Sequence, residues 1–142
     1  MKLMKLVVLI LAISCIFGCA ASTKQKPILT PELQVDSAYS GITENDVKNV
    51  IAEACGERGW KIDASEEGLI EASILVRNKH RAVIRIPYSS KNIRIEYKDS
   101  SNLLYEDKEG PVIHRNYNRW VNNLLHDITN KLTAISNSRI VK

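Results

Sequence analysis

Residues 60–98, WKIDASEEGLIEASILVRNKHRAVIRIPYSSKNIRIEYK, decide the fold. Apolar and polar residues alternate in this stretch, and a period of two indicates strands with one buried face. Turn residues interrupt the alternation at Gly68, at Asn78-Lys79 and at 89–92. Such short connections join antiparallel neighbours, so the stretch predicts a four-stranded antiparallel meander. Its predicted strands cover residues 60–64, 70–77, 81–88 and 93–98.

Helical patterns flank the meander on both sides. Thr43 and Asp46 have the spacing of a capping box, and a helix is predicted from Thr43 to about Arg58. A second helix is predicted from about Arg115, where the apolar residues return to a helical period. The predicted fold is therefore α+β: a two-layer sandwich in the order α-β-β-β-β-α, with both helices packed on one face of the meander.

The chain begins with the features of an export signal. Lys2 and Lys5 precede an apolar run over residues 6–17, which is too short to span a bilayer comfortably. The run ends in Ile16-Phe17-Gly18-Cys19, which resembles the lipobox of bacterial lipoproteins. We predict a lipoprotein signal peptide over residues 1–18 and a lipidated Cys19. Lipoprotein processing attaches three acyl chains, such as palmitate, which would make the membrane anchor effectively permanent.

Two alternatives remain for this segment. Cleavage before Cys15, after Ala12-Ile13-Ser14, would place the lipid on Cys15 and shorten the apolar run. An uncleaved membrane helix would have only residues 6–21 available, fewer than the ~20 apolar residues that a spanning helix needs. Ala20 is not the aspartate of the inner-membrane retention signal. The predicted location is therefore the cell envelope, facing the periplasm, with the outer membrane favoured over the inner.

Composition limits what the rest of the chain can be. Residues 19–41 contain prolines and small polar residues without a period, which predicts a flexible tether behind the lipidated cysteine. The alternative is that residues 27–31 lie extended against the domain. Residues 42–142 are predicted to form a single α+β domain. The formal charge of +4 falls to +2 once Lys2 and Lys5 leave with the signal, which argues against a nucleic-acid partner. Cys55 then has no cysteine with which to form an intramolecular disulfide.

The sequence contains no pattern typical of catalysis, metal binding or cofactor binding. The three histidines, His80, His114 and His126, lack metal-ligand spacing, and Cys55 lies on an apolar helical stripe. We predict no catalytic residue, no metal and no cofactor. The enzymatic alternative is a cell-wall-directed hydrolase that uses His114 with Asp99 or Ser100.

Two groups of residues are candidates for binding. The first is a basic sheet face made by Arg77, Arg81, Arg85 and Arg94, which would meet anionic lipid or lipopolysaccharide. Its alternative is an ordinary solvated face in which Glu71 and Glu96 form cross-strand pairs. The second is a polar, aromatic corner at the start of the second helix, suited to sugars, peptides or a partner protein. Its residues are Tyr97, Asp99, Ser100, His114, Asn116, Tyr117, Asn118 and Trp120.

Four segments resemble a group of small, uncharacterised bacterial lipoproteins. They are Gly59-Trp60, Tyr97-Lys98-Asp99-Ser100, Leu103-Leu104-Tyr105 and Ile113-His114-Arg115-Asn116-Tyr117-Asn118-Arg119-Trp120. The last segment, of the type Ile-His-x-Asn-Tyr-Asn-x-Trp, is the most specific of the four. The resemblance implies a lipid-anchored envelope protein and supplies no catalytic residues. We expect a binding or accessory module that contacts the membrane through its anchor and has an envelope protein as its partner.

Overall fold

The computed structural model describes residues 24–35 and 39–141. The predicted signal peptide and the lipidation of Cys19 lie outside the described residues. The described elements, in chain order, are β1 (Gln25–Pro27), β2 (Glu32–Gln34), α1 (Glu44–Glu57), β3 (Lys61–Glu66), β4 (Leu69–Val76), β5 (His80–Pro87), β6 (Asn92–Arg94), β7 (Glu96–Ser101), β8 (Glu106–Asp107), β9 (Pro111–His114) and α2 (Arg115–Ile140).

The predicted α+β class and the four-stranded antiparallel sheet are confirmed. The strand order is β3-β4-β5-β7, and every neighbouring pair is antiparallel. Ile84 in β5 pairs with Ala72 in β4 and with Tyr97 in β7. The buried positions of β5 include Ala82, Ile84 and Ile86, as the alternation in the sequence predicts. The observed element order contains more strands than the predicted α-β-β-β-β-α.

The predicted fourth strand is divided into two. β6 leaves the four-stranded sheet and pairs with β2, whereas β7 pairs with β5 and runs on through Ser101. The sequence pattern therefore misplaced the strand end, because Asp99 and Ser100 belong to β7 rather than to a break after Lys98. Their polar side chains are satisfied within the fold: Asp99 pairs with Arg81, and Ser100 bonds Tyr97. Tertiary partners of this kind override low strand propensity.

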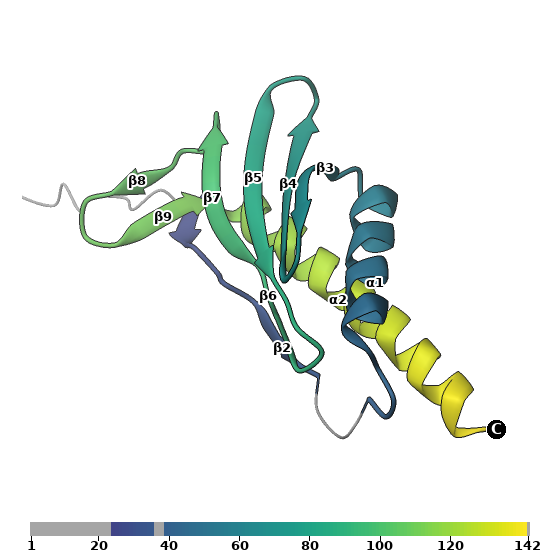
Figure 1. Ribbon diagram of the computed structural model, residues 1–142. Helices are drawn as coiled ribbons and strands as arrows, with labels where there is room; N and C mark the ends of the chain where they lie inside the picture. The colour runs from purple at the N-terminus through teal and green to yellow at the C-terminus, as the bar shows by residue number, and fades with distance from the viewer. Residues whose placement is uncertain (1–23, 36–38, 142) are drawn as a thin grey trace, which may run out of the picture.

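Of the two courses that the sequence left open for residues 19–41, the structure shows the extended one, which was expected for residues 27–31 and covers residues 24–35. Residues 24–35, here called the strap, run along the domain (Figure 1), where β1 pairs with β9 and β2 pairs with β6. Val35 is buried, and its amide donates to the carbonyl of Lys91. The strap shows no hydrophobic period because its two strands are only three residues each. Its backbone instead completes strands that are distant in sequence. The folded part therefore begins before residue 42.

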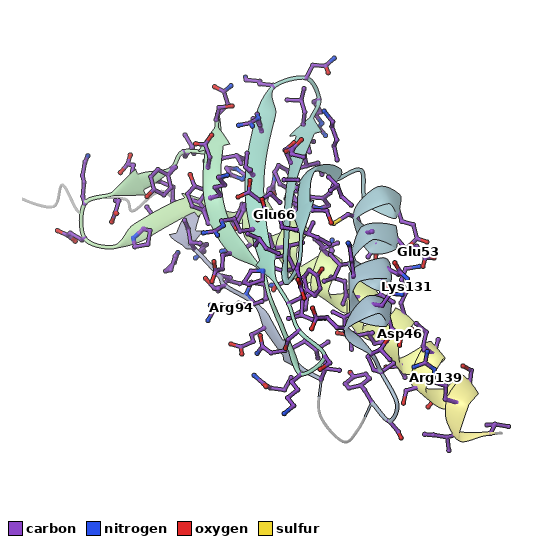
Figure 2. All side chains as sticks on the ribbon, viewed as in Figure 1. Asp46, Glu53, Glu66, Arg94, Lys131 and Arg139 are labelled. Carbon is purple, nitrogen blue, oxygen red and sulfur yellow. The ribbon has the colours of Figure 1, made fainter. Side chains whose placement is uncertain are left out.

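The two helices are confirmed at their predicted starts. Thr43 caps α1, and its reciprocal bonds with Asp46 complete the capping box. Buried residues of α1, α2 and the sheet form one hydrophobic core. Ion pairs join the two helices, and Figure 2 shows Asp46 beside Arg139 and Lys131 beside α1. No helix in the described part of the chain is long and apolar enough to cross a membrane.

A second sheet has the strand order β1-β9-β8, and its strand β9 leads directly into α2. In Figure 1 the β8–β9 hairpin, here called the arm, projects away from the four-stranded sheet. Ile113 and His114 belong to β9, so the helical segment begins only at Arg115. Asn102 and Leu104 both have positive φ (55° and 54°), and this redirects the chain from β7 into the arm.

The turn between β4 and β5 is strained. Arg77 and Asn78 have φ of 54° and 50°, and the Lys79 amide donates to the Val76 carbonyl, as in a type I′ turn. Asparagine tolerates this conformation, whereas arginine does not favour it. We expect Arg77→Asn to raise the free energy of unfolding by about 0.5–1 kcal/mol, as measured by urea denaturation. A lower stability would contradict the assigned turn geometry. The exposed Lys79→Asn, which removes the same charge, is the matched control.

Candidate functional site

The strap, β6, β7 and the arm line an open groove of about 500 Å³. Each of these elements contributes residues that lie far apart in the sequence. The strap forms one wall of the groove, β6 and the start of β7 form the second, and the arm forms the third. The residues that line the groove are Ile28, Thr30, Arg94, Glu96, Tyr97, Tyr105, Asp107 and Pro111.

Tyrosine rings form the apolar part of this site. The rings of Tyr97 and Tyr105 are stacked, with centroids 5.0 Å apart and planes 9° apart. Tyr117 meets Tyr97 edge-on at 5.6 Å and is completely buried. The three rings thus extend from the surface at Tyr105 into the core at Tyr117. Stacked and edge-to-face pairs of this kind hold aromatic rings in a defined orientation.

The polar groups of the groove have fixed positions. The hydroxyls of Tyr97 and Ser100 share a hydrogen bond of 2.9 Å. Partial burial raises the pKa of Tyr97, so its phenol is a neutral hydrogen-bonding group at physiological pH. Arg94 forms a 2.7 Å ion pair with Glu96 at the edge of the groove. The site therefore combines an aromatic wall with both signs of charge.

The start of α2 serves structure rather than the groove. His114 caps the helix, and its Nδ1 accepts a hydrogen bond of 3.2 Å from the Asn116 amide. Burial, followed by the positive charge of Arg115, lowers the pKa of His114 and favours the neutral ring that this acceptor role requires. Asn116 accepts a bond from Arg119 at 3.1 Å.

Asn118 fastens the strap to α2. Its Nδ2 donates to the carbonyl of Pro27 at 2.8 Å, and its Oδ1 accepts from the amide of Leu29 at 3.0 Å. The side chain therefore replaces a strand neighbour between β1 and β2, where the strap has no ladder. The predicted corner divides accordingly: Tyr97 lines the groove, Ser100 bonds it, and Tyr117 supports it from below. Asn118 and Trp120 have structural positions, Trp120 being packed against the core.

The groups of the hydrolase alternative each have a different hydrogen-bond partner. Asp99 pairs with Arg81 at 3.1 Å, Ser100 bonds Tyr97, and His114 caps α2. No hydrogen bond joins His114 to Asp99 or Ser100 among the described residues. Within residues 24–35 and 39–141, no group of three or more His, Cys, Asp or Glu side chains is placed to hold a metal ion. Burial raises the pKa of the Cys55 thiol to about 12, which makes it a poor nucleophile.

The arginines of the predicted basic face that lie on strands are paired with acids, and Arg94 lies on β6, outside the four-stranded sheet. Arg81 pairs with Asp99, Arg85 with Glu71 at 3.5 Å, and Arg94 with Glu96. Glu71 also holds Lys98 at 2.7 Å. Arg77 does not belong to the face, because β4 ends at Val76 and Arg77 lies in the strained turn. Because Glu71 is shared by Arg85 and Lys98, these pairs reduce the positive charge of the face but do not cancel it.

Several groove residues escaped the sequence interpretation. Ile28 and Thr30 lie in the segment expected to be either a tether or an extended chain against the domain, and no binding role was predicted for Asp107 or Pro111. Tyr105 carried the one available signal, a large aromatic beside two leucines just before polar turn residues. Comparison with protein-family models, with curated proteins and with solved structures finds no match for this chain.

Proposed function

We propose that this protein is a lipid-anchored accessory module of the cell envelope that binds an extended peptide segment of a partner protein in the groove. The observation that carries the proposal is the Tyr97–Tyr105 stack beside β7, the outer strand of the four-stranded sheet. Aromatic rings that are held rigidly and partly exposed provide contact area at little cost in conformational entropy.

The groove fits a peptide for two further reasons. In the described part of the chain, β7 is paired only with β5, so its other edge has backbone groups available for an added strand. Arg94, Glu96 and Asp107 offer hydrogen bonds to charged or amide side chains of a bound segment. Peptides that add to a sheet edge gain affinity from main-chain bonds and specificity from side-chain pockets.

The anchor and the absence of catalysis are parts of the same proposal. The signal-like residues 1–18 and the lipobox support lipidation of Cys19 and an outer-membrane, periplasm-facing position. The resemblance to small bacterial lipoproteins supports it further. We also propose that both helices cover one face of the sheet in a two-layer sandwich, which the core that they share with the sheet supports. The separate hydrogen-bond partners of His114, Asp99 and Ser100 favour binding over hydrolysis. Mass spectrometry should find a triacylated Cys19 at the mature N-terminus. An intact Met1 in the membrane fraction would contradict the anchor.

Peptide binding is tested by panning a random peptide library against the full mature chain. Enriched peptides should bind Tyr105→Ala at least about thirtyfold more weakly, which matches the loss of an aromatic hot spot of about 2 kcal/mol. Leu75→Ala is the matched control, because Leu75 is an exposed apolar residue of β4 that does not line the groove. Equal affinity for Tyr105→Ala, or the failure of any peptide to be enriched, would exclude the groove as a peptide site.

A further inference from the structure

Unpaired cations gather where the strap begins. The Arg115 amide donates to the Lys24 carbonyl at 2.7 Å, and Gln25 of β1 lies opposite His114 of β9. Lys24, Lys26, Arg115 and Arg119 are exposed, and no ion pair within the described ranges involves any of them. The strand arginines of the sheet face are paired with acids, whereas these four cations are not.

The surroundings reinforce this positive charge. The first turn of α2 contains no acidic residue, so the positive end of the helix dipole is not compensated there. After burial, the nearby side chains of Arg115, His80, Lys24 and Arg119 also lower the pKa of His114, which caps the helix. The acidic turn of the arm lies at the opposite end of β9, where Asp107 pairs with Pro111.

An exposed leucine lies at the same end of the molecule. Leu104 is 50% exposed, and its carbonyl accepts a 2.9 Å hydrogen bond from the side chain of Gln25. Cations beside an exposed leucine match the chemistry of a membrane interface, in which aliphatic side chains enter the headgroup region and basic groups meet phosphates.

The length of the chain before Lys24 determines what this surface can reach. Only residues 20–23 separate Cys19 from Lys24, and a fully extended chain would span at most about 17 Å from one to the other. The helix α2 alone, with 26 residues, is about 39 Å long. A domain of this size on so short a connection must keep its Lys24 end close to the lipid.

We infer that Lys24, Lys26, Leu104, Arg115 and Arg119 form an anchor-side surface that docks on the anionic phospholipid headgroups of the membrane holding Cys19. The inference rests on the proposed lipid anchor. Docking orients the domain, with the N-terminus of α2 at the membrane and its C-terminus pointing away.

The test uses the native lipidated protein in vesicles of phosphatidylcholine and phosphatidylglycerol that contain a headgroup quencher. A fluorophore is attached either to Lys26→Cys or to Ser138→Cys, near the far end of α2. Cys55 is buried with a raised thiol pKa and does not compete for the dye. We expect quenching to be several-fold stronger at position 26 than at position 138. High salt should reduce the difference, because it screens the attraction between the cations and the lipid.

Charge reversal supplies the matched comparison. Lys24→Glu/Arg115→Glu/Arg119→Glu should lower the ratio of quenching at position 26 to quenching at position 138, whereas Lys48→Glu/Lys61→Glu/Lys91→Glu, with the same change in charge, should not. Three results would overturn the proposed docking. They are equal quenching at the two positions of the native protein, stronger quenching at position 138, and a ratio of quenching between positions 26 and 138 that responds neither to salt nor to charge reversal. If the dye labels the protein that carries no introduced cysteine, Cys19 has a free thiol, and the proposed lipid anchor is wrong.

Discussion

Replacing Asn118 with alanine is expected to lower the free energy of unfolding by about 2 kcal/mol. The side chain is almost fully buried and makes two hydrogen bonds to the strap, one to the Pro27 carbonyl and one from the Leu29 amide. Alanine removes both hydrogen bonds and leaves the Pro27 carbonyl and the Leu29 amide without these partners on α2. Urea denaturation of the purified chain measures the change in stability. Limited proteolysis should show faster cleavage between β1 and β2.

The design includes a control for helix propensity. Asn122→Ala lies one turn further along α2, where Asn122 is exposed, and it should change stability slightly in the favourable direction. Asn118→Asp keeps an acceptor for the Leu29 amide but loses the donor to Pro27, so its effect should be intermediate. If Asn118→Ala were as stable as Asn122→Ala, the strap would not depend on this side chain.

Replacing Asp46 with asparagine is expected to lower the free energy of unfolding by about 1–2 kcal/mol at neutral pH. Asp46 accepts bonds from the Thr43 amide and hydroxyl at the start of α1. It also accepts two bonds of 2.9 Å from Arg139, which ties the last turns of α2 to the start of α1 (Figure 2). An amide at this position can satisfy only part of this set and carries no charge. Thermal and urea denaturation measure the difference.

The same substitution should change how stability depends on pH. The bonds from Arg139, and then from Thr43, hold the pKa of Asp46 far below its ordinary value. A carboxylate with a lowered folded-state pKa contributes stability that is fully present above about pH 5 and is lost as the pH falls through about 4 toward the lowered value. The gap between wild type and Asp46→Asn should therefore narrow on acidification. A constant gap between pH 7 and about pH 2 would contradict this role.

Asp63→Asn is the control for this experiment. Asp63 faces Lys61 at 3.9 Å on β3 and takes part in no helix cap, so its substitution should change stability by less than about 0.5 kcal/mol. A loss equal to that of Asp46→Asn would show that general charge balance, rather than the helix junction, determines the effect.

The regular elements were predictable because their signals are local. The alternation over residues 70–77 and 81–88 predicts two strands, and the structure has β4 and β5 there, with Ile70, Ala72, Ala82, Ile84 and Ile86 buried as expected. The capping box at Thr43 and Asp46 and the helical stripe after Arg115 likewise marked both helix starts. Each pattern reflects contacts between residues three or four apart, or the pleat of a single strand.

The candidate site was predictable only in part. Tyr97 and Ser100 were recognised as members of a polar, aromatic corner, and they do meet at the groove. Asn116 and Asn118 were assigned to the same corner, but their bonds go to Arg119 and to the strap. A residue type that suits ligand binding suits backbone capping equally well, since both uses rely on the same donors and acceptors.

The sequence alone determined the α+β class, the four-stranded antiparallel sheet and the starts of both helices, because each of these depends on the periodicity of neighbouring residues. The tertiary structure alone decided that the strap pairs with β9 and β6, that Asn118 bonds the strap and that Tyr105 stacks on Tyr97. These contacts join residues that are far apart in the chain or separated by irregular turns, and no local period records them. The groove exists only where such contacts meet.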